Sequence, residues 1–319
     1  MSAIPAQNSK SNKSKAKVEV ETENYLGAMF STKFVVAYGL YTTTATFDPF
    51  EAVKSKMTEA DLSLFYEAVV RNLDHNRAAS REGVDLHTVV AFHSPVGRGS
   101  EPALRTRGRM MVTLKDGVID PTCPEDYDIV VNDGNMPKGM SCHRWVVGQV
   151  SHSGDVAGKK LDPTYGFPLD LTGLMRFFFV YVVNDSNPNG DPAVRGGPPR
   201  RTFEGYGEIS GPCIKAGLRL YVIKTEQGSC LNSTGGDLDA IQRQFKSSSG
   251  AVAGLWDLRV LGGLLTVHPD GKPRGPIQIG PAKTTHTVRI VPTKGRRNGG
   301  HIRTREVKKG KVQTETDAE

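Results

Sequence analysis

The chain has few of the features that mark membrane-spanning, disulfide-linked or zinc-binding proteins. It contains no run of about eighteen apolar residues, the shortest that usually crosses a bilayer as a helix. Its longest apolar run, Phe177–Val183, has the length of a strand, and its N-terminus is too polar for a signal sequence. The four cysteines form no Cys-x-x-Cys pair and have no histidine at metal-ligand spacing. We therefore expect a cytoplasmic protein with reduced thiols, no membrane partner and no metal or other cofactor.

Sequence motifs of the common enzyme classes are missing as well. The chain has no GxSxG, no HExxH and no GxxxxGK[ST] sequence. Gly205-Tyr206-Gly207 with Gly211 approaches a dinucleotide loop, but the third glycine lies one residue too far along the chain and no acidic ribose partner is evident. The sequence thus gives little support for catalysis, and we expect a protein that is not an enzyme.

Positive charge is concentrated near the C-terminus. The formal net charge is +7, and residues Lys294–Lys311 alone carry eight lysines and arginines against one acid, Glu306. Such a segment attracts polyanions, because neutralised phosphates release condensed counterions. Nucleic acid is one partner that fits this charge, and an anionic surface is another. A solvated loop or tail explains the same composition.

The 319 residues, 37% of them hydrophobic, are enough for a sizeable core between two polar ends. Residues 1–23 and 293–319 lack the apolar content that offsets ordering entropy, so we expect both ends to be disordered. The pattern between them predicts alternating strands and helices. It predicts strands at 34–47, 86–92, 109–113 and 175–184, a helix from 59 to about 81, a helix at 209–223, an apolar segment at 255–267, a glycine- and arginine-rich loop at 97–108 and a linker at 142–174.

The 175–184 strand carries aromatic and aliphatic side chains on both faces. Burial of both faces in a core is one interpretation. Stacking of its rings on unpaired RNA bases, as in RNA-recognition folds, is the other.

A dense turn-forming cluster follows this strand at once. It reads Asn187-Pro188-Asn189-Gly190-Asp191-Pro192 and continues to the arginines 195, 200 and 201. Glycines let backbone amides approach a ligand closely, and arginines can form forked contacts with phosphates. An ordinary surface turn accounts for the same residues.

These motifs, taken together, resemble a known family. Phe178–Arg219, with NPNGDP, a Pro-Arg pair and GEISGPCIKAGLR, resembles the N-terminal part of the Cascade backbone subunit, CRISPR-associated family seven, nearest to its type I-C branch. The stretch Trp256-Asp257-Leu258-Arg259 through Gly263, followed by Arg274-Gly275-Pro276-Ile277-Gln278, is similar to the family's central Asp-x-Arg and GPxQ motifs.

The remaining matches come in the wrong order. Residues 37–41, the helix at 59–81 and residues 124–137 resemble the family's C-terminal part, yet here they come first. Circular permutation is the simplest account, with the usual termini joined through 142–174. We therefore predict two core portions, 24–141 and 175–292, flanked by the ends at 1–23 and 293–319.

The resemblance implies a fold and a set of partners. The fold class would be α+β, with a modified RNA-recognition (ferredoxin-like) core, finger- and thumb-like insertions and a circularly permuted order. The function would be binding of guide RNA (crRNA) in antiviral defence. Copies would assemble along the spacer beside the other Cascade subunits, namely the large subunit and the subunit that caps the 5′ end of the guide. Target DNA would be held by pairing to the guide.

Basic and turn-forming residues are the candidates for sequence-independent RNA contact. For Arg259, an ion pair with Asp257 or another acid is an equal alternative. The candidates are Asn187, Asn189, Gly190, Arg195, Arg200, Arg201, Lys215 and Arg219, then Arg259 and Arg274, then Arg77 and Arg81.

Two other functions compete with this one. Related backbone subunits of type III complexes cleave target RNA with a loop aspartate, for which Asp185 or Asp191 is the candidate here. A stand-alone RNA-binding module is the other alternative, and it predicts a monomer with sequence preference.

Overall fold

The computed structural model describes residues 20–26, 29–75, 82–189, 197–225, 227–230, 245, 247–263, 272–297 and 302–308. The chain divides into a large unit, residues 33–293, and a small unit drawn from the two ends, residues 1–32 and 294–319. The described part of the small unit includes an antiparallel ladder in which β1 (Val20–Leu26) pairs with β13 (Ile302–Lys308).

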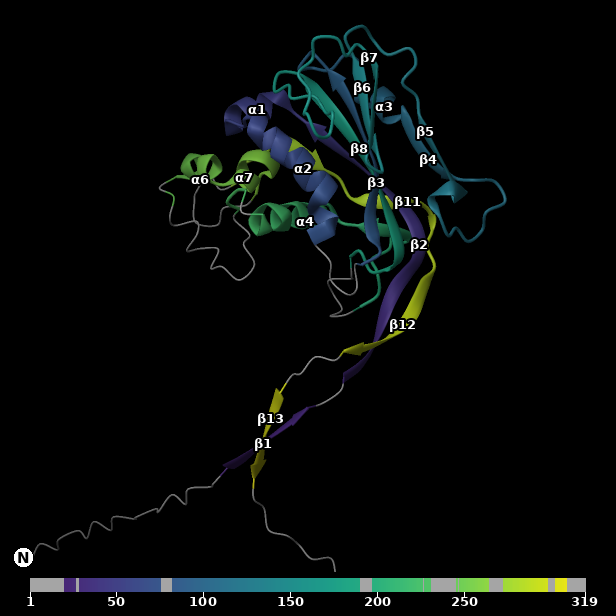
Figure 1. Cartoon of the computed structure of the whole chain (residues 1–319), viewed down its shortest axis with the longest axis vertical. Coiled ribbons are helices and arrows are strands. Elements are labelled where there is room, and N and C mark those ends of the chain that lie inside the picture. The colour runs from purple at the N-terminus through teal and green to yellow at the C-terminus, as the bar shows by residue number, and fades with distance from the viewer. Residues whose placement is uncertain are drawn as a thin grey trace, which may run out of the picture. The chain divides into compact units, whose positions relative to one another are not determined.

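The large unit is built on a nine-stranded sheet (Figure 1). Its strands follow the order β7-β6-β3-β8-β2-β11-β9, each antiparallel to its neighbours, and β10 and β12 also pair with β2. The strands are β2 (Met29–Phe47), β3 (Val84–Ser94), β6 (Ser141–Val146), β7 (Gln149–Gly154), β8 (Leu174–Ser186), β9 (Tyr206–Ile209), β10 (Ile277–Ile279), β11 (Ala282–Thr287) and β12 (Ile290–Arg297).

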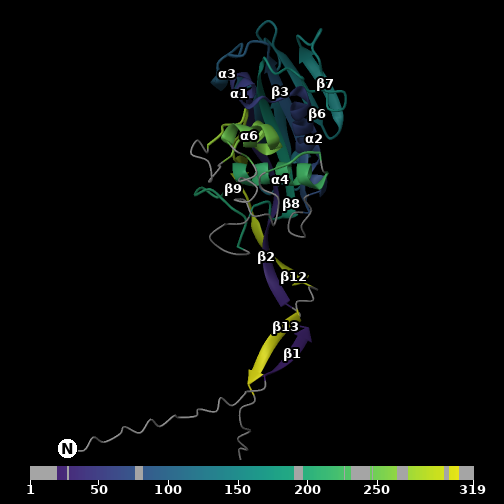
Figure 2. The same cartoon turned by 90° about the vertical axis from the view of Figure 1, so that its left-hand side faces the viewer.

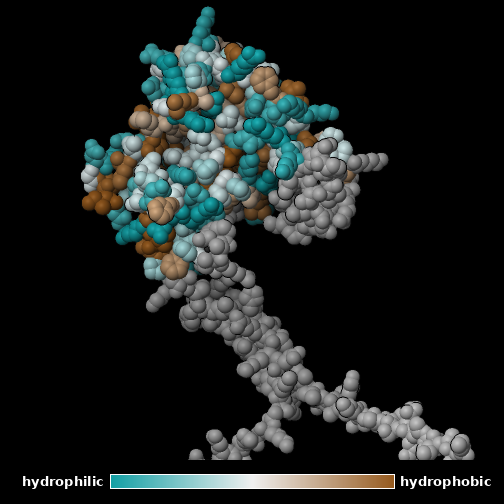
Figure 3. Space-filling view, turned by 180° about the vertical axis from the view of Figure 1, so that it is seen from behind, coloured by the Kyte–Doolittle hydropathy of each residue, from teal (hydrophilic) through white to brown (hydrophobic). Residues whose placement is uncertain are grey.

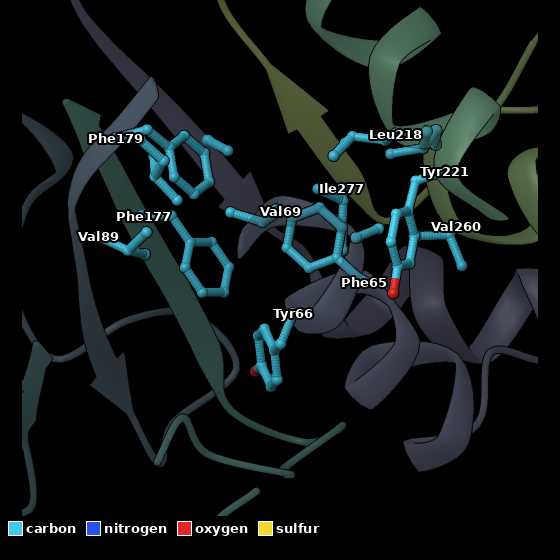
Figure 4. Packing of buried hydrophobic residues seen from close by; sticks show 14 of the residues in the cluster. Phe65, Tyr66, Val69, Val89, Phe177, Phe179, Leu218, Tyr221, Val260 and Ile277 are labelled. Atoms are coloured by element: carbon cyan, nitrogen blue, oxygen red, sulfur yellow. The ribbon is translucent and has the colours of Figure 1, made fainter. Parts of the chain in front are cut away.

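Strand β8 lies in the middle of this sheet and is buried on both faces. Phe177 and Phe179 pack with the helices, whereas Phe178 and Val180 pack on the opposite face. Figure 4 shows the helix side, where Phe65 and Tyr66 approach Phe177. The strand prediction at 175–184 is confirmed, and of its two interpretations, core burial is the one that the structure supports.

All of the described helices except the short α3 cover one face of the sheet (Figure 1). Helix α2 begins with a capping box, because Thr58 N donates to Asp61 Oδ2 (2.8 Å) and Asp61 N donates to Thr58 Oγ1 (3.2 Å). The tail of its predicted range, 76–81, lies outside the described residues. The helices are α1 (Pro49–Ser55), α2 (Glu59–His75), α3 (Ala103–Arg107), α4 (Gly211–Lys224), α6 (Ser248–Gly254) and α7 (Trp256–Leu261), with a 3₁₀ turn, η1, at Pro124–Asp126.

A two-stranded hairpin, β4 (Met110–Leu114) and β5 (Tyr127–Val131), covers part of the other face. Arg109 fixes its base. This buried guanidinium forms a paired contact with Glu101 (2.6 and 2.9 Å) and donates to the carbonyls of Asn132 and Gly134 (3.0 Å each). The rest of this face, beyond the hairpin, is open.

Three sequence expectations differ from the structure. The loop predicted at 97–108 contains α3. The 142–174 segment, expected to be a linker, contains most of the β6–β7 hairpin, which extends the sheet beside β3. The ends predicted to be disordered include residues 20–23 of β1 and all of β13. In each case pairing with distant strands or local hydrogen bonding orders a segment whose composition alone is typical of loops.

Two further observations concern the described residues. None of their helices combines the length and the apolar character that crossing a bilayer requires. The four cysteines are free thiols.

Candidate nucleic-acid interface

Two of the predicted RNA-binding cations on α4 face the interior instead. Lys215 Nζ donates to the carbonyl of Leu261 (3.0 Å), and burial, followed by the nearby Arg219, lowers its pKa. Arg219 Nε donates to Asp257 Oδ2 (2.8 Å) and its Nη2 to Gly262 O (3.3 Å). The prediction that both share one side of a helix is correct. That side packs against α7, where internal hydrogen bonds already engage both charges, and their contact with phosphate stays a prediction.

Arg259 is engaged in the same way. Its Nε and Nη2 donate to the two carboxylate oxygens of Asp61 (2.9 and 2.7 Å), and its Nη1 donates to Ala253 O. This paired contact holds the pKa of Asp61 below its usual range, against the opposing effect of burial. The ion-pair alternative is therefore confirmed for Arg259, with Asp61 as the acid in place of Asp257.

The glycine-rich motif after α7 also has a structural use. Gly262 has a φ of +70°, and a side chain there would meet the backbone nitrogen of Gly275 at 2.4 Å. The two backbone segments can approach this closely only because both residues lack a Cβ atom. Gly263 N donates to Pro273 O (3.1 Å), and Gln278 Nε2 donates to Gly275 O (2.6 Å). The motif thus fastens α7 to the start of β10.

The turn-forming cluster is partly described. Asn187 Nδ2 donates to Gly197 O (3.3 Å), and the backbone nitrogen of Arg200 donates to Asn189 O (2.8 Å). Gly190 and Arg195 lie outside the described residues, as do Arg77, Arg81 and Asp191. The described part forms the ordered turn that was one of its two interpretations, and its role in RNA contact stays a prediction.

The remaining predicted cations are at the surface. Arg200 Nε forms an ion pair with Glu208 (2.9 Å), and the side chain of the next residue, Arg201, is exposed. Arg274 is exposed between α7 and β10. Asp185, the candidate for the cleavage alternative, is exposed at the end of β8 with a φ of +44°, a conformation that aspartate tolerates.

A polar strip on the open face of the sheet was missed by the sequence analysis. Thr42, Thr44 and Thr46 alternate along β2 with the helix-facing Tyr41 and Ala45. The alternation is visible in the sequence, but the long, uniformly strand-like run around it concealed which face is polar. Direct register partners share a face of a sheet, so two cations join this strip: Arg176 lies opposite Thr46, and Lys283 lies opposite Thr42.

Arg107 of α3 completes a groove over this strip. The groove has a volume of about 270 Å³. Its polar lining residues are Thr42, Thr43, Thr44, Arg107 and Lys283, and its apolar lining residues are Met110, Val112, Phe178, Phe179 and Pro281. Figure 3 shows the molecule from the side opposite to that of Figure 1, and hydrophilic and hydrophobic residues intermix there with no single continuous apolar area. The hydroxyls and the two cations of this groove suit an anionic chain, and its apolar residues make up the other half of the lining.

Arg107 of the groove and Arg176, which lies near it, repel one another. Burial and then the positive charge of Arg107 lower the pKa of Arg176. Glu101 opposes this effect, but its carboxylate is already held by Arg109. Two neighbouring guanidinium groups raise the local positive potential, and an anionic ligand between them would relieve the repulsion.

A comparison with known protein families gives one match. A family model described as CRISPR-associated protein Cas7 matches residues 2–132 and 174–313, well over half of the chain. No curated protein and no solved structure gives a match. The protein therefore belongs to the CRISPR-associated protein Cas7 family, whose members are backbone subunits of complexes that bind guide RNA. The unmatched part, 133–173, contains β6 and β7.

Proposed function

We propose that the protein is a non-catalytic backbone subunit whose copies line up along the spacer of a guide RNA and leave its bases free to pair with target DNA. The observation that carries this proposal is the groove on the open face of the sheet. Its contacts would be with phosphates and sugars, because cations and threonine hydroxyls bind the backbone without reading bases. The type I-C branch, the neighbouring Cascade subunits and the ferredoxin-like core belong to the same proposal.

The groove differs from the interface that the sequence suggested. Arg107 and Lys283 in the groove, with Arg176 near them, take the place of Lys215, Arg219 and Arg259. The charges of those three residues are engaged within the fold. Arg107 and Lys283 are exposed, although Lys283 also lies 3.8 Å from Glu208. Both keep enough freedom to meet a phosphate.

Charge reversal in the groove tests the proposal. Arg107→Glu and Lys283→Glu should each weaken binding of a guide-like RNA about tenfold. Each should also make the negative slope of log K against log salt less steep by about 0.7, the value for one phosphate contact in single strands. Lys54→Glu on α1, also an exposed cation, is the matched control. Fluorescence anisotropy at several salt concentrations measures both quantities.

Equal losses for the groove variants and the Lys54 control would contradict the groove assignment. The non-catalytic part has its own test. Incubation of the RNA-bound protein with a complementary RNA and Mg²⁺ should leave the target intact, and cleavage that disappears in Asp185→Asn would establish the alternative enzyme function instead.

A further inference from the structure

A cavity on the helix side of the sheet is separate from the groove. It has a volume of about 300 Å³ and is lined by residues of α2, β3 and β6, the β6–β7 turn and the loop at Thr164. Figure 2 shows the β6–β7 edge of the sheet next to α2. Leu86 and Trp145 of the lining pack with the core cluster under the helices. The cavity and the groove share no lining residue.

The charged side chains of this cavity come from α2. Asp85 borders the cavity as well, but it precedes Leu86 in β3, and successive side chains of a strand point to opposite faces. Its register partner Val182 packs on the hairpin side of the sheet, so the Asp85 side chain lies on that side too. The cavity therefore has one cation, Arg71, and one anion, Asp74.

The walls of the cavity form a slot for a planar ring. Trp145 is half-buried, so part of its indole surface faces the open space, and Tyr165 supplies a second aromatic wall. Aromatic rings of this kind stack on planar ligands, and nucleobases stack on them without regard to sequence. Apolar side chains complete the lining, namely Val70, Leu73 and Leu86.

The two charges at the cavity accept a ligand with two kinds of polar group. Arg71 Nη1 lies 3.9 Å from Asp74 Oδ2, and the side chains are 55% and 51% exposed, so both are accessible. Hydrogen bonding to the Tyr165 phenol raises the pKa of Arg71 and holds its guanidinium beside the aromatic wall. A purely anionic ligand would meet the carboxylate, and a purely cationic one would meet the guanidinium. A phosphate next to hydroxyl donors satisfies both.

The aromatic walls belong to the segment that the family model does not match. Trp145 lies in β6 and Tyr165 in the loop after β7, both within residues 133–173, whereas Arg71 and Asp74 lie in the matched part. The cavity exists only because the unmatched segment packs beside α2. It is therefore a feature of this chain that the matched residues do not provide by themselves.

We propose that this cavity, the Trp145 pocket, binds a nucleoside monophosphate. The base stacks on Trp145, the Arg71 guanidinium binds the phosphate, and the Asp74 carboxylate accepts hydrogen bonds from the ribose hydroxyls. Its volume is at the lower end of the range for small-molecule sites, about 300 to 1,000 Å³. A free nucleotide and an unpaired nucleotide of a strand present the same chemistry, and the experiment below distinguishes them. The site is additional to the proposed guide-binding groove.

Intrinsic fluorescence reports this site directly. The chain has two tryptophans, and Trp256 is only 2% exposed, so a ligand that stacks in the pocket should quench mainly Trp145. Titration with adenosine monophosphate should quench the fluorescence to saturation. Adenosine should bind about tenfold more weakly, because it lacks the phosphate that Arg71 binds. Inorganic phosphate alone should produce no quenching, because it has no ring to stack.

Variants assign the two charges. Arg71→Ala should weaken binding of adenosine monophosphate about tenfold and leave adenosine within about twofold of the parent. Asp74→Asn should weaken both ligands about fivefold, since both carry the ribose. Arg98→Ala, which removes an exposed arginine outside the pocket, is the matched control and should change neither affinity. Trp145→Ala, followed by calorimetry, should abolish measurable binding, and circular dichroism verifies that each variant is folded.

Guide-like RNA identifies the source of the nucleotide. If adenosine monophosphate quenches Trp145 equally in the free and the RNA-loaded protein, the pocket takes a free nucleotide. If RNA itself quenches Trp145 and blocks the added nucleotide, and Arg71→Ala removes both effects, the pocket holds a nucleotide of the strand. Either result supports the site.

Two results would overturn the inference. One is the absence of saturable quenching by either ligand, and the other is quenching that Arg71→Ala leaves unchanged. The proposed function fails separately, if the parent does not bind guide-like RNA while adenosine monophosphate still quenches Trp145.

Discussion

At the residue scale, the arginines near α4 and α7 show what a sequence can and cannot establish about a cation. Their motif was recognised, and the alternative of an ion pair was stated for Arg259. The partner that decides between these uses is Asp61, which lies 198 positions away in the sequence. The spacing of residues in the sequence gives no information about such a distant pair. The positive charge of Arg219 and Arg259 therefore suggested phosphate contact, although their side chains hold helices together.

Removing Asp257 should be costly for the same reason. Its carboxylate, 1% exposed, pairs with the largely buried Arg219. Asp257→Ala would leave the Arg219 charge buried without this partner and should lower the free energy of unfolding by about 3 kcal/mol. Urea denaturation followed by circular dichroism measures the change.

The matched control is an exposed pair. Glu51→Ala on α1, which removes the partner of the exposed Lys54, should cost less than about 1 kcal/mol. The double variant of Asp257→Ala with Arg219→Ala should be less destabilised than the sum of the two single variants. Simple additivity would mean that the pair contributes nothing specific to the fold.

At the scale of elements, hydrophobic periodicity predicted the strands and helices with long regular patterns. Each of these predictions has a counterpart in the structure. The predicted strands correspond to β2 (34–47), β3 (86–92), β4 (109–113) and β8 (175–184), and the predicted helices that begin at 59 and 209 correspond to α2 and α4. The β6–β7 hairpin was missed because its residues are rich in glycine, serine and histidine. Its turn, Val147-Gly148, has positive φ at both positions. The sequence that usually predicts such a turn is Asn-Gly, which is absent here.

The same hairpin holds a buried polar network. Ser141 Oγ lies 2.8 Å from His143 Nε2 and accepts from Lys159 Nζ (2.8 Å), which also contacts His93 Nδ1 (3.1 Å). His93 Nε2 contacts Asp170 Oδ2 (2.8 Å). These bonds fasten the loop after β7 to β3 and β6.

This network should make stability depend on pH. Burial, followed by electrostatic effects of the neighbouring His152 and His93, lowers the pKa of His143 to about 3 from its ordinary 6.5. Between these values the unfolded chain binds the proton that the folded chain excludes, so stability falls as pH drops from about 6.5 towards 3. Asp170, whose pKa is lowered chiefly by its bond to His93, adds to the loss below pH 3.8.

The comparison with His143→Gln isolates the histidine. Glutamine keeps a donor and an acceptor but does not titrate, so the stability difference between parent and variant should shrink steadily as pH falls from 7 to 4 in urea titrations. A difference that stays constant over this range would show that His143 does not carry the pH dependence.

At the scale of the whole molecule, the family predicted from motifs is confirmed, whereas the circular permutation stays a prediction. The portions 24–141 and 175–292 do not form separate domains. Strands β3 and β2 from the first portion alternate with β8, β11 and β9 from the second in one sheet. The stability of such an interleaved sheet depends on which strands pair with one another. The order of those strands along the chain can therefore change while the pairing is kept.

Restoring the order expected for the family tests the permutation. The chain would open between Ala157 and Gly158, an exposed turn where Gly158 has a φ of +70° and no neighbour near its Cβ position, and the present ends would be joined. In the small unit Val20 of β1 pairs with Lys308 of β13, so the described residues nearest to the two ends of the chain are neighbours in one ladder. We expect this variant to fold with an unfolding free energy within about 2 kcal/mol of the parent, because the cut breaks no strand pairing.

A second opening provides the contrast. A chain cut between Phe178 and Phe179, in the middle of β8, interrupts the strand that pairs with both β2 and β3 and should not fold. Circular dichroism and RNA anisotropy report folding and binding for both variants. If the chain opened at Gly158 folds and binds RNA like the parent, the segment 142–174 only connects the two core portions, and the fold does not need this connection. If it fails while the parent is stable, the β6–β7 hairpin and its loop are an integral part of the fold, and the unusual order of motifs needs another explanation.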